Sequence, residues 1–168
     1  WLAGASGSKR FMIAPVIMWF RSDLRLADNT ALNAAWRSGS PILPVFVFDP
    51  GILNSRLAGA PRSAFLLKAL ASLDTALRDR GRRLITRYGN PLRELPNVIE
   101  ASGASAVYFN RDYSPYALRR DAALGSILEV PVYGFDDSLL VAAAEISKKD
   151  GAPYTVYTPF RKQWLAVP

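Results

Sequence analysis

Five short apolar runs, rich in β-branched and aromatic residues, alternate with helical patterns along the chain. They are PVIMWF (15–20), PILPVFVFD (41–49), RRLITRY (82–88), SAVYFN (105–110) and VPVYGF (130–135). Continuous apolar runs are typical of strands that helices cover on both faces, whereas half-exposed strands alternate apolar and polar residues. Repeated βα units with right-handed crossovers therefore predict a doubly wound α/β fold. We expect a five-stranded, Rossmann-like parallel sheet in the order 3-2-1-4-5, flanked by helices.

The gaps between these runs carry the signals of helices. The first helix is expected to begin after Asp28, whose carboxylate can accept backbone N–H bonds as an N-cap, and to end at Gly39. The second has Pro61 near its first turn and ends at Gly81. Leucines three or four residues apart form its apolar stripe: Leu66, Leu70, Leu73 and Leu77.

Two further helices are expected over 91–102 and 115–128, so the repeating pattern ends near Phe135. We therefore place an α/β domain at residues 13–135. Residues 136–168 have weaker periodicity, two prolines in the stretch from 153 to 159 and an Asp-Gly turn. Because a compact domain seldom carries so long a tail, this segment is interpreted as a connector.

Composition disfavours several kinds of chemistry. The 168 residues contain no cysteine and no histidine, which argues against thiolate metal sites, metal hydrolysis and Ser-His catalysis. Neither G-x-G-x-x-G nor G-x-x-x-x-G-K-[ST] follows a predicted strand, so ordinary dinucleotide and nucleoside-triphosphate sites are disfavoured too. Apolar runs are shorter than the roughly 20 residues of a membrane helix, and the first residues lack the apolar region of a secretory signal. We expect a soluble, cytoplasmic protein whose net charge of +7 is dispersed.

Ligands of a doubly wound sheet bind beyond the carboxyl ends of its strands. That rule selects Phe20, Arg21, Asp23, Phe48, Asp49, Gly89, Asn90, Asn110, Asp112 and Tyr113. Arg62 joins them, because an arginine that opens a helix opposes the helix dipole, although it is equally consistent with a solvated charge. For Asp23 and Arg25 a structural role in ion pairs of the first loop is favoured, whereas Phe20 and Arg21 stay ligand candidates. Aromatic surface beside arginine and carboxylate suits a flat heteroaromatic ring with polar edges.

Five stretches resemble, in order, the photolyase and cryptochrome family: WFRSDLRLADNTAL, PVFVFDP, PRSAFLLKALASLDTAL, YFNRDYSPYALRRD and PYTVYTPFRKQW. The resemblance covers residues 15–164 and implies that residues 13–135 are the N-terminal antenna domain of that family. It implies that the connector leads to an all-helical domain, absent from this chain, which holds FAD and binds damaged DNA. The chain alone would then have no catalytic residue, and its partners would be that domain and, through it, DNA.

The resemblance also implies that this domain houses a light-harvesting chromophore, which is a deazaflavin, FMN or methenyltetrahydrofolate in family members. The flavin-type chromophores would lie at the strand ends, where Phe20, Arg21, Phe48, Arg62 and Asp112 match. The strand-end rule adds three more cofactor-binding candidates: Asp49, Asn110 and Tyr113. A folate would sit between domains instead. The parent protein would be a deoxyribodipyrimidine photolyase, a carbon–carbon lyase that repairs pyrimidine dimers. A cryptochrome photoreceptor and an unrelated α/β nucleotide-binding module remain the alternatives.

Overall fold

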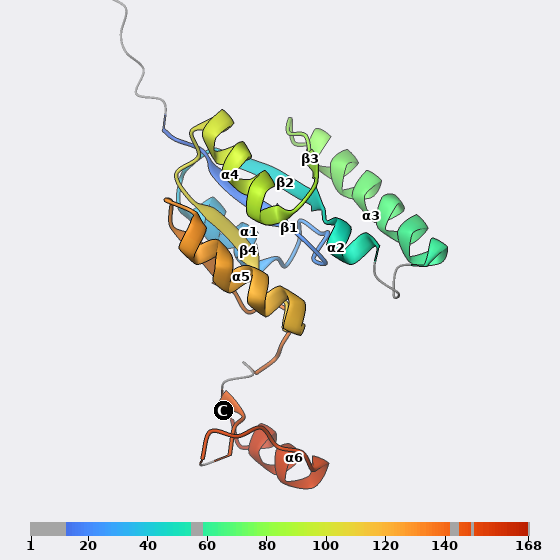
Figure 1. The fold of residues 1–168 in the computed structure, drawn as a ribbon, viewed down its shortest axis with the longest axis vertical. Coiled ribbons are helices and arrows are strands. Elements are labelled where there is room, and N and C mark those ends of the chain that lie inside the picture. The colour runs from blue at the N-terminus through green and yellow to red at the C-terminus, as the bar shows by residue number, and fades with distance from the viewer. Residues whose placement is uncertain (1–12, 55–58, 142–144, 149, 168) are drawn as a thin grey trace, which may run out of the picture.

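The fold is taken from a computed structural model, which describes residues 13–54, 59–141, 145–148 and 150–167. A five-stranded sheet forms its centre, with every neighbouring pair parallel and the order β3-β2-β1-β4-β5 (Figure 1). The strands are β1 (Val16–Phe20), β2 (Ile42–Phe48), β3 (Ile85–Tyr88), β4 (Val107–Asn110) and β5 (Val132–Phe135). The predicted fold class and strand order are confirmed.

Six helices accompany the sheet in the part of the chain that the structure describes. They are α1 (Thr30–Arg37), α2 (Pro50–Leu53), α3 (Ala60–Arg78), α4 (Pro91–Ser102), α5 (Pro115–Ile127) and α6 (Tyr157–Leu165). Four of these, α1, α3, α4 and α5, are the predicted helices. The short turn α2 lies directly after β2, and α6 lies within the predicted connector, so sequence patterns missed both.

The central strand β1 is buried along its whole length and divides the core into two parts. Ile17 and Trp19 pack with residues of α4 and α5 on one face of the sheet, whereas Met18 and Phe20 pack with residues of α1 and α3 on the other. Successive side chains of a strand point to opposite faces, so a continuous apolar run was the correct signal for this doubly covered strand. The predicted leucine stripe of α3 is confirmed, since Leu70, Leu73 and Leu77 are buried in the second cluster.

A proline in the middle of β2 is tolerated because of where the next strand begins. Pro44 has Met18 of β1 as its parallel partner, while pairing with β3 starts only at Val45. A proline has no N–H to donate, so it fits a strand position that lacks a neighbour on one side. This detail lets a Pro-containing run form an inner strand.

The N-cap of α1 corrects one sequence prediction. Asn29, not Asp28, caps the helix: its backbone is extended (φ −117°) and its side-chain oxygen accepts from Leu32 N at 3.0 Å. Asp28 lies one residue before the cap and has a left-handed backbone (φ 50°). Asp and Asn are about equally good caps, so the pattern Asp-Asn-Thr did not by itself select between them.

Beyond β5 the chain runs away from the sheet, and Figure 1 shows α6 apart from the layers of helices that cover it. The domain at residues 13–135 and the connector at residues 136–168 stay predictions. Among the described residues, none of the helices combines the length and apolarity that crossing a membrane requires.

Candidate functional site

The loops after β1 and β4 are joined by a buried polar network at the carboxyl edge of the sheet. Asn110, the last residue of β4, donates through its amide to Asp23 Oδ2 at 2.5 Å and to Asn29 Oδ1 at 2.9 Å. The side-chain oxygen Oδ1 of Asn110 accepts from Ala31 N at 2.9 Å. Asn29 also donates to Asp23 Oδ2 at 3.2 Å, and Asp23 accepts from Arg21 N at 2.8 Å. Because these groups are buried, the network fixes the path of the first loop.

Arg21 forms an ion pair with a residue of α5, a helix that is distant in the sequence. Its Nη1 donates to both carboxylate oxygens of Asp121 in α5, each at 2.8 Å, and its Nη2 donates to the Asn110 carbonyl. Burial lowers the pKa of the Arg21 guanidinium, and the nearby carboxylate of Asp121 opposes that shift. The Nε of Arg21 is buried and has no hydrogen-bond partner among the described residues. Arg21 therefore serves mainly as a scaffold, with one donor left over.

A second arginine of α5 completes an arrangement around Trp19. The Arg120 guanidinium lies over the Trp19 ring at 4.7 Å from its centre, and the Arg21 guanidinium lies over it at 5.0 Å. Arg120 also donates to Asp121 Oδ1 at 3.0 Å. Buried arginine against an aromatic face adds cation–π attraction to the ion pairs.

Asp49 is engaged in anchoring α2 to α5. It caps α2 by accepting from Gly51 N at 2.9 Å, and its second oxygen accepts from the Tyr116 hydroxyl at 2.7 Å. Burial and the contact with Asp49 raise the pKa of Tyr116. A Cβ at position 51 would lie 2.8 Å from the Tyr116 hydroxyl oxygen, so glycine permits this close approach.

The loops after β4 and β5 form a more exposed polar cluster. Tyr113 donates to Asp136 Oδ1 at 2.5 Å, and Arg111 Nη1 lies 3.3 Å from the same oxygen. Burial, followed by the hydrogen bond to Asp136, raises the pKa of Tyr113 to about 12. Asp112 accepts from Ser114 N at 2.8 Å through one oxygen, just before Ser114 caps α5.

Asp137, two residues after β5, binds to the beginning of α1 and to the first loop. Its Oδ1 accepts from Thr30 N and Thr30 Oγ1, both at 2.9 Å, and its Oδ2 accepts from Arg25 Nη2 at 2.7 Å. Burial opposes ionisation of Asp137, but these hydrogen bonds outweigh it and lower the pKa of the carboxyl. Arg25 is thus ion-paired as expected, although its partner lies outside the first loop, whereas the ligand candidate Arg21 pairs with Asp121 of α5.

The structure divides the eight predicted site residues into two groups. Arg21, Asp49 and Asn110 use polar groups in internal contacts, and Phe20 is buried on the α1–α3 face of the sheet. The other four keep accessible surface at or near the carboxyl edge. They are Phe48, Arg62, Asp112 and Tyr113. Phe48 packs edge-on against Phe46, with ring centres 5.0 Å apart. Residues 55–58, between α2 and α3, lie outside the described residues.

Sequence reasoning missed the partners that α5 contributes. Arg120 and Asp121 fall between Ala117 and Leu124, so two charged residues occupy the apolar stripe of this helix. Charged residues at such positions are rarely buried unless they are paired. This was the available signal that α5 reaches over the edge of the sheet.

An accessible aromatic ring, a free carboxylate oxygen and an exposed guanidinium are chemically suited to a planar ligand with polar edges. The buried Nε of Arg21 also has no partner among the described residues, but the guanidinium lies against Trp19 and Phe109, on the face of the sheet opposite to that of Phe48. Proton transfer chemistry has less support, since the polar groups at this edge mostly satisfy one another. These internal contacts hold the edge in a fixed conformation.

Comparison with known proteins shows which family the chain belongs to. The sequence matches the profile described as DNA photolyase over residues 16–168. A deoxyribodipyrimidine photo-lyase of Agrobacterium fabrum is 39% identical over 157 residues, which cover 92% of this chain and 32% of that protein. Relatives named as cryptochromes also match.

Two solved structures have the same fold. A bacterial class III photolyase from Agrobacterium tumefaciens has a TM-score of 0.85 at 35% identity, covering 98% of this chain and 34% of that one. An archaeal photolyase from Sulfolobus tokodaii, described with two FAD molecules and a novel light-harvesting cofactor, has a TM-score of 0.68 at 28% identity, covering 89% and 34%. The chain spans about a third of the length of these photolyases. It belongs to the DNA photolyase family.

Proposed function

We propose that this chain is the light-harvesting domain of a DNA photolyase. In this role it binds a chromophore that absorbs light and passes the excitation to FAD in a separate helical domain. The observation that carries the proposal is the family match over residues 16–168, which includes all five strands of the sheet. The Sulfolobus photolyase, whose structure is described as implicating a light-harvesting cofactor, shares this fold and adds support.

The chemistry of the chain agrees with this role. Energy transfer needs no acid, base or nucleophile from the protein, and the sequence has no histidine or cysteine to supply one. It does need a chromophore held in a fixed position. The buried network of Asp23, Asn29 and Asn110, together with the Arg21–Asp121 pair, supplies a stiff edge on which to place one.

We place the chromophore at the carboxyl edge of the sheet. Phe48 would contact the ring plane, Arg62 would lie beside a carbonyl or phosphate, and Asp112 would accept from a ring or ribitol donor. Tyr113, next to Asp112, belongs to the same surface. These roles favour a deazaflavin or FMN. Methenyltetrahydrofolate is the competing chromophore and would use a different surface.

The full protein would use reduced FAD and light to split pyrimidine dimers in DNA, with FAD and DNA contacts provided outside this chain. A cryptochrome is the second candidate, because Cryptochrome-1 of Arabidopsis thaliana is 35% identical over 156 residues covering 90% of this chain. An assay of light-driven dimer repair by the full-length protein separates the two. Repair activity identifies the photolyase, and its absence with intact FAD identifies the photoreceptor.

Titration of FMN, a deazaflavin and methenyltetrahydrofolate into the chain tests the site. Asp112→Ala should weaken flavin-type binding about ten- to hundredfold, because a ligand donor loses its acceptor. Since Asp112 also accepts from Ser114 N, Asp112→Asn is the informative companion: it keeps an oxygen for the turn and removes the charge. Arg62→Ala should weaken binding similarly, while Lys68→Ala, an exposed cation on the same helix, serves as the matched control.

The results have clear opposite readings. Loss of binding in the Asp112 and Arg62 variants, with normal binding by Lys68→Ala, supports the placement. Equal affinities in all of these proteins would make the residues structural. Saturable binding of the folate alone would move the chromophore away from this edge.

A further inference from the structure

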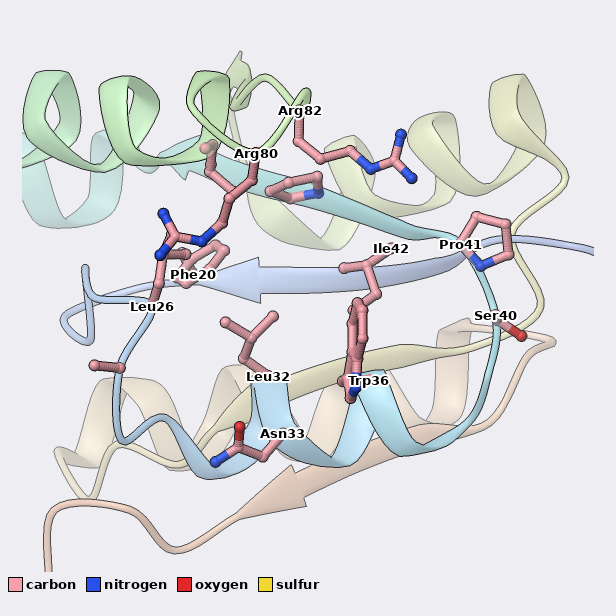
Figure 2. Close-up of a pocket in the computed structure, with 13 residues that line it drawn as sticks. Phe20, Leu26, Leu32, Asn33, Trp36, Ser40, Pro41, Ile42, Arg80 and Arg82 are labelled. Carbon is pink, nitrogen blue, oxygen red and sulfur yellow. The ribbon is translucent and has the colours of Figure 1, made fainter.

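A groove separates α1 from α3 on the face of the sheet that these two helices cover. Its volume is about 670 Å³, and its floor is formed by Phe20 of β1 and by Ile42 and Pro44 of β2. Figure 2 shows Leu32 and Trp36 rising from the α1 side and Arg80 and Arg82 on the opposite side, just after the end of α3, with their guanidinium groups pointing away from each other. The predicted chromophore residue Phe20 thus faces a second, different hollow.

The groove exists because the two helices lie over different strands. α1 contacts β1, β4 and β5, whereas Leu70, Leu73 and Leu77 of α3 pack with Phe46 of β2. On the opposite face, α4 and α5 contact each other directly. The strip of sheet between α1 and α3 is therefore left with an apolar floor and open sides.

Trp36 is an unusual residue for the wall of such a groove. Its side chain is 76% exposed, although it lies in the last turn of an otherwise amphipathic helix. Figure 2 shows its indole directed into the groove toward Ile42. Exposed tryptophan beside an apolar floor offers a stacking surface for a flat ring, and such surfaces are characteristic of binding sites.

The wall opposite Trp36 carries two arginines that are not paired with carboxylates among the described residues. Arg80 donates to the Ala76 carbonyl, and among the described residues neither Arg80 nor Arg82 pairs with a carboxylate. None of the described residues that line the groove is acidic. Two guanidinium groups at one wall therefore favour an anion, and their planar donor sets suit a carboxylate, sulfonate or phosphate.

We propose that this groove binds a small aromatic anion, with its ring against Trp36 and the apolar floor and its anionic group toward Arg82. The volume is that of a typical small-molecule pocket, and the combination of apolar walls with a few polar groups on one side is the usual composition of such sites. The groove lies between helices on one face of the sheet, so it is distinct from the proposed chromophore edge and does not depend on it.

The fluorescent probe 8-anilinonaphthalene-1-sulfonate tests the proposal, with neutral N-phenyl-1-naphthylamine as its uncharged counterpart. Wild-type chain should bind the sulfonate saturably and about tenfold more tightly than the neutral amine, and added salt should reduce that difference. Arg82→Ala and Trp36→Ala should each weaken sulfonate binding about tenfold, and Trp36→Phe should restore most of the loss. Both wild-type side chains are exposed, so the variants should melt at the temperature of wild type.

Matched variants separate this site from others on the chain. Phe65→Ala removes an exposed aromatic residue of α3 that does not line the groove, and Arg119→Ala removes an exposed arginine of α5. Asp112→Ala removes a residue of the proposed chromophore edge. All three should bind the sulfonate as wild type does. Equal binding of the sulfonate and the neutral amine would overturn the anion preference. Undiminished binding by Trp36→Ala and Arg82→Ala, or the same loss in Phe65→Ala, would overturn the site.

Discussion

Arg21 Nη1 donates to both oxygens of Asp121 across a sequence separation of 100 residues, and thereby joins the first loop to α5. The side chains are only 8% and 15% exposed. Asp121→Ala would leave a buried guanidinium without its counter-charge, so we expect a loss of about 3 kcal/mol in the free energy of unfolding. Urea denaturation measures it. Asp79→Ala, which removes an exposed carboxylate at the end of α3, should change stability little, and equal effects would contradict the structural role of the pair.

The two asparagine caps of this fold offer a matched comparison. Asn29 caps α1 and also bonds Asp23 and Asn110 in the buried network, whereas Asn90 caps α4 from an exposed position. Asn90→Ala should cost about 1 kcal/mol, the usual value of a cap. Asn29→Ala should cost about 3 kcal/mol, because it also leaves buried polar groups unpaired. Thermal or urea unfolding of both variants decides this, and similar losses would show that the network adds nothing to the cap.

The Tyr113–Asp136 contact should appear in the alkaline titration. The pKa of Tyr113 is raised to about 12 by burial and then by the hydrogen bond to Asp136. The folded state favours the neutral phenol, so this stabilisation is fully present below the unfolded pKa of about 10 and is lost as the pH rises toward 12. Ultraviolet absorbance of the phenolate measures the titration.

Two variants identify the tyrosine responsible. Tyr113→Phe should remove the step near pH 12, and Asp136→Asn should move it to lower pH. Tyr88→Phe, at an exposed position on β3, should leave that step in place. A step that survives in Tyr113→Phe would assign it to another residue.

The backbone amides of α6 should be less protected from hydrogen exchange than those of α3, α4 and α5. It has nine residues, and none of them is buried in the described structure. Isolated helices of this length are marginal in water, so we expect its amides to exchange within about tenfold of the rates in an unfolded peptide. Amides of β1 should exchange only through global opening. Strong protection of residues 157–165 in the same hydrogen-exchange experiment would contradict the interpretation of this segment as a connector.

The sheet was predictable because its signals are local and its topology is restricted. Four of the strands are short, mainly apolar runs, whereas the edge strand β3 is half polar and mostly exposed, and right-handed crossovers leave few ways to order five parallel strands. The cap at Asn29 was missed by one residue, because neighbouring Asp28 has the same capping chemistry. The four-residue helix α2 was missed because no periodicity can develop over so short a length.

The candidate site stays a prediction, and the sequence could not tell which of its residues have partners inside the fold. The strand-end rule selected Arg21, Asp49 and Asn110. Their polar groups, however, form hydrogen bonds with residues that lie far away in the sequence. Asp121 binds Arg21, and Tyr116 binds Asp49, both from α5. A strand-end charge that binds a ligand and one that binds a later helix look alike in the sequence, since the distinction is made by tertiary packing.

Asp137 fixes the chain just after β5 to the start of α1. It binds Thr30 and Arg25 directly after β5, the strand at one side of the sheet, which has β4 alone as its neighbour. A pull on the chain beyond Ser138 is therefore borne first by the Asp137 carboxylate and delivered to the first turn of α1. Without that anchor the load would fall on β5, which a force can peel away one hydrogen bond at a time. Asp137 is thus the point at which a load applied beyond β5 passes to α1 before it reaches the edge of the sheet.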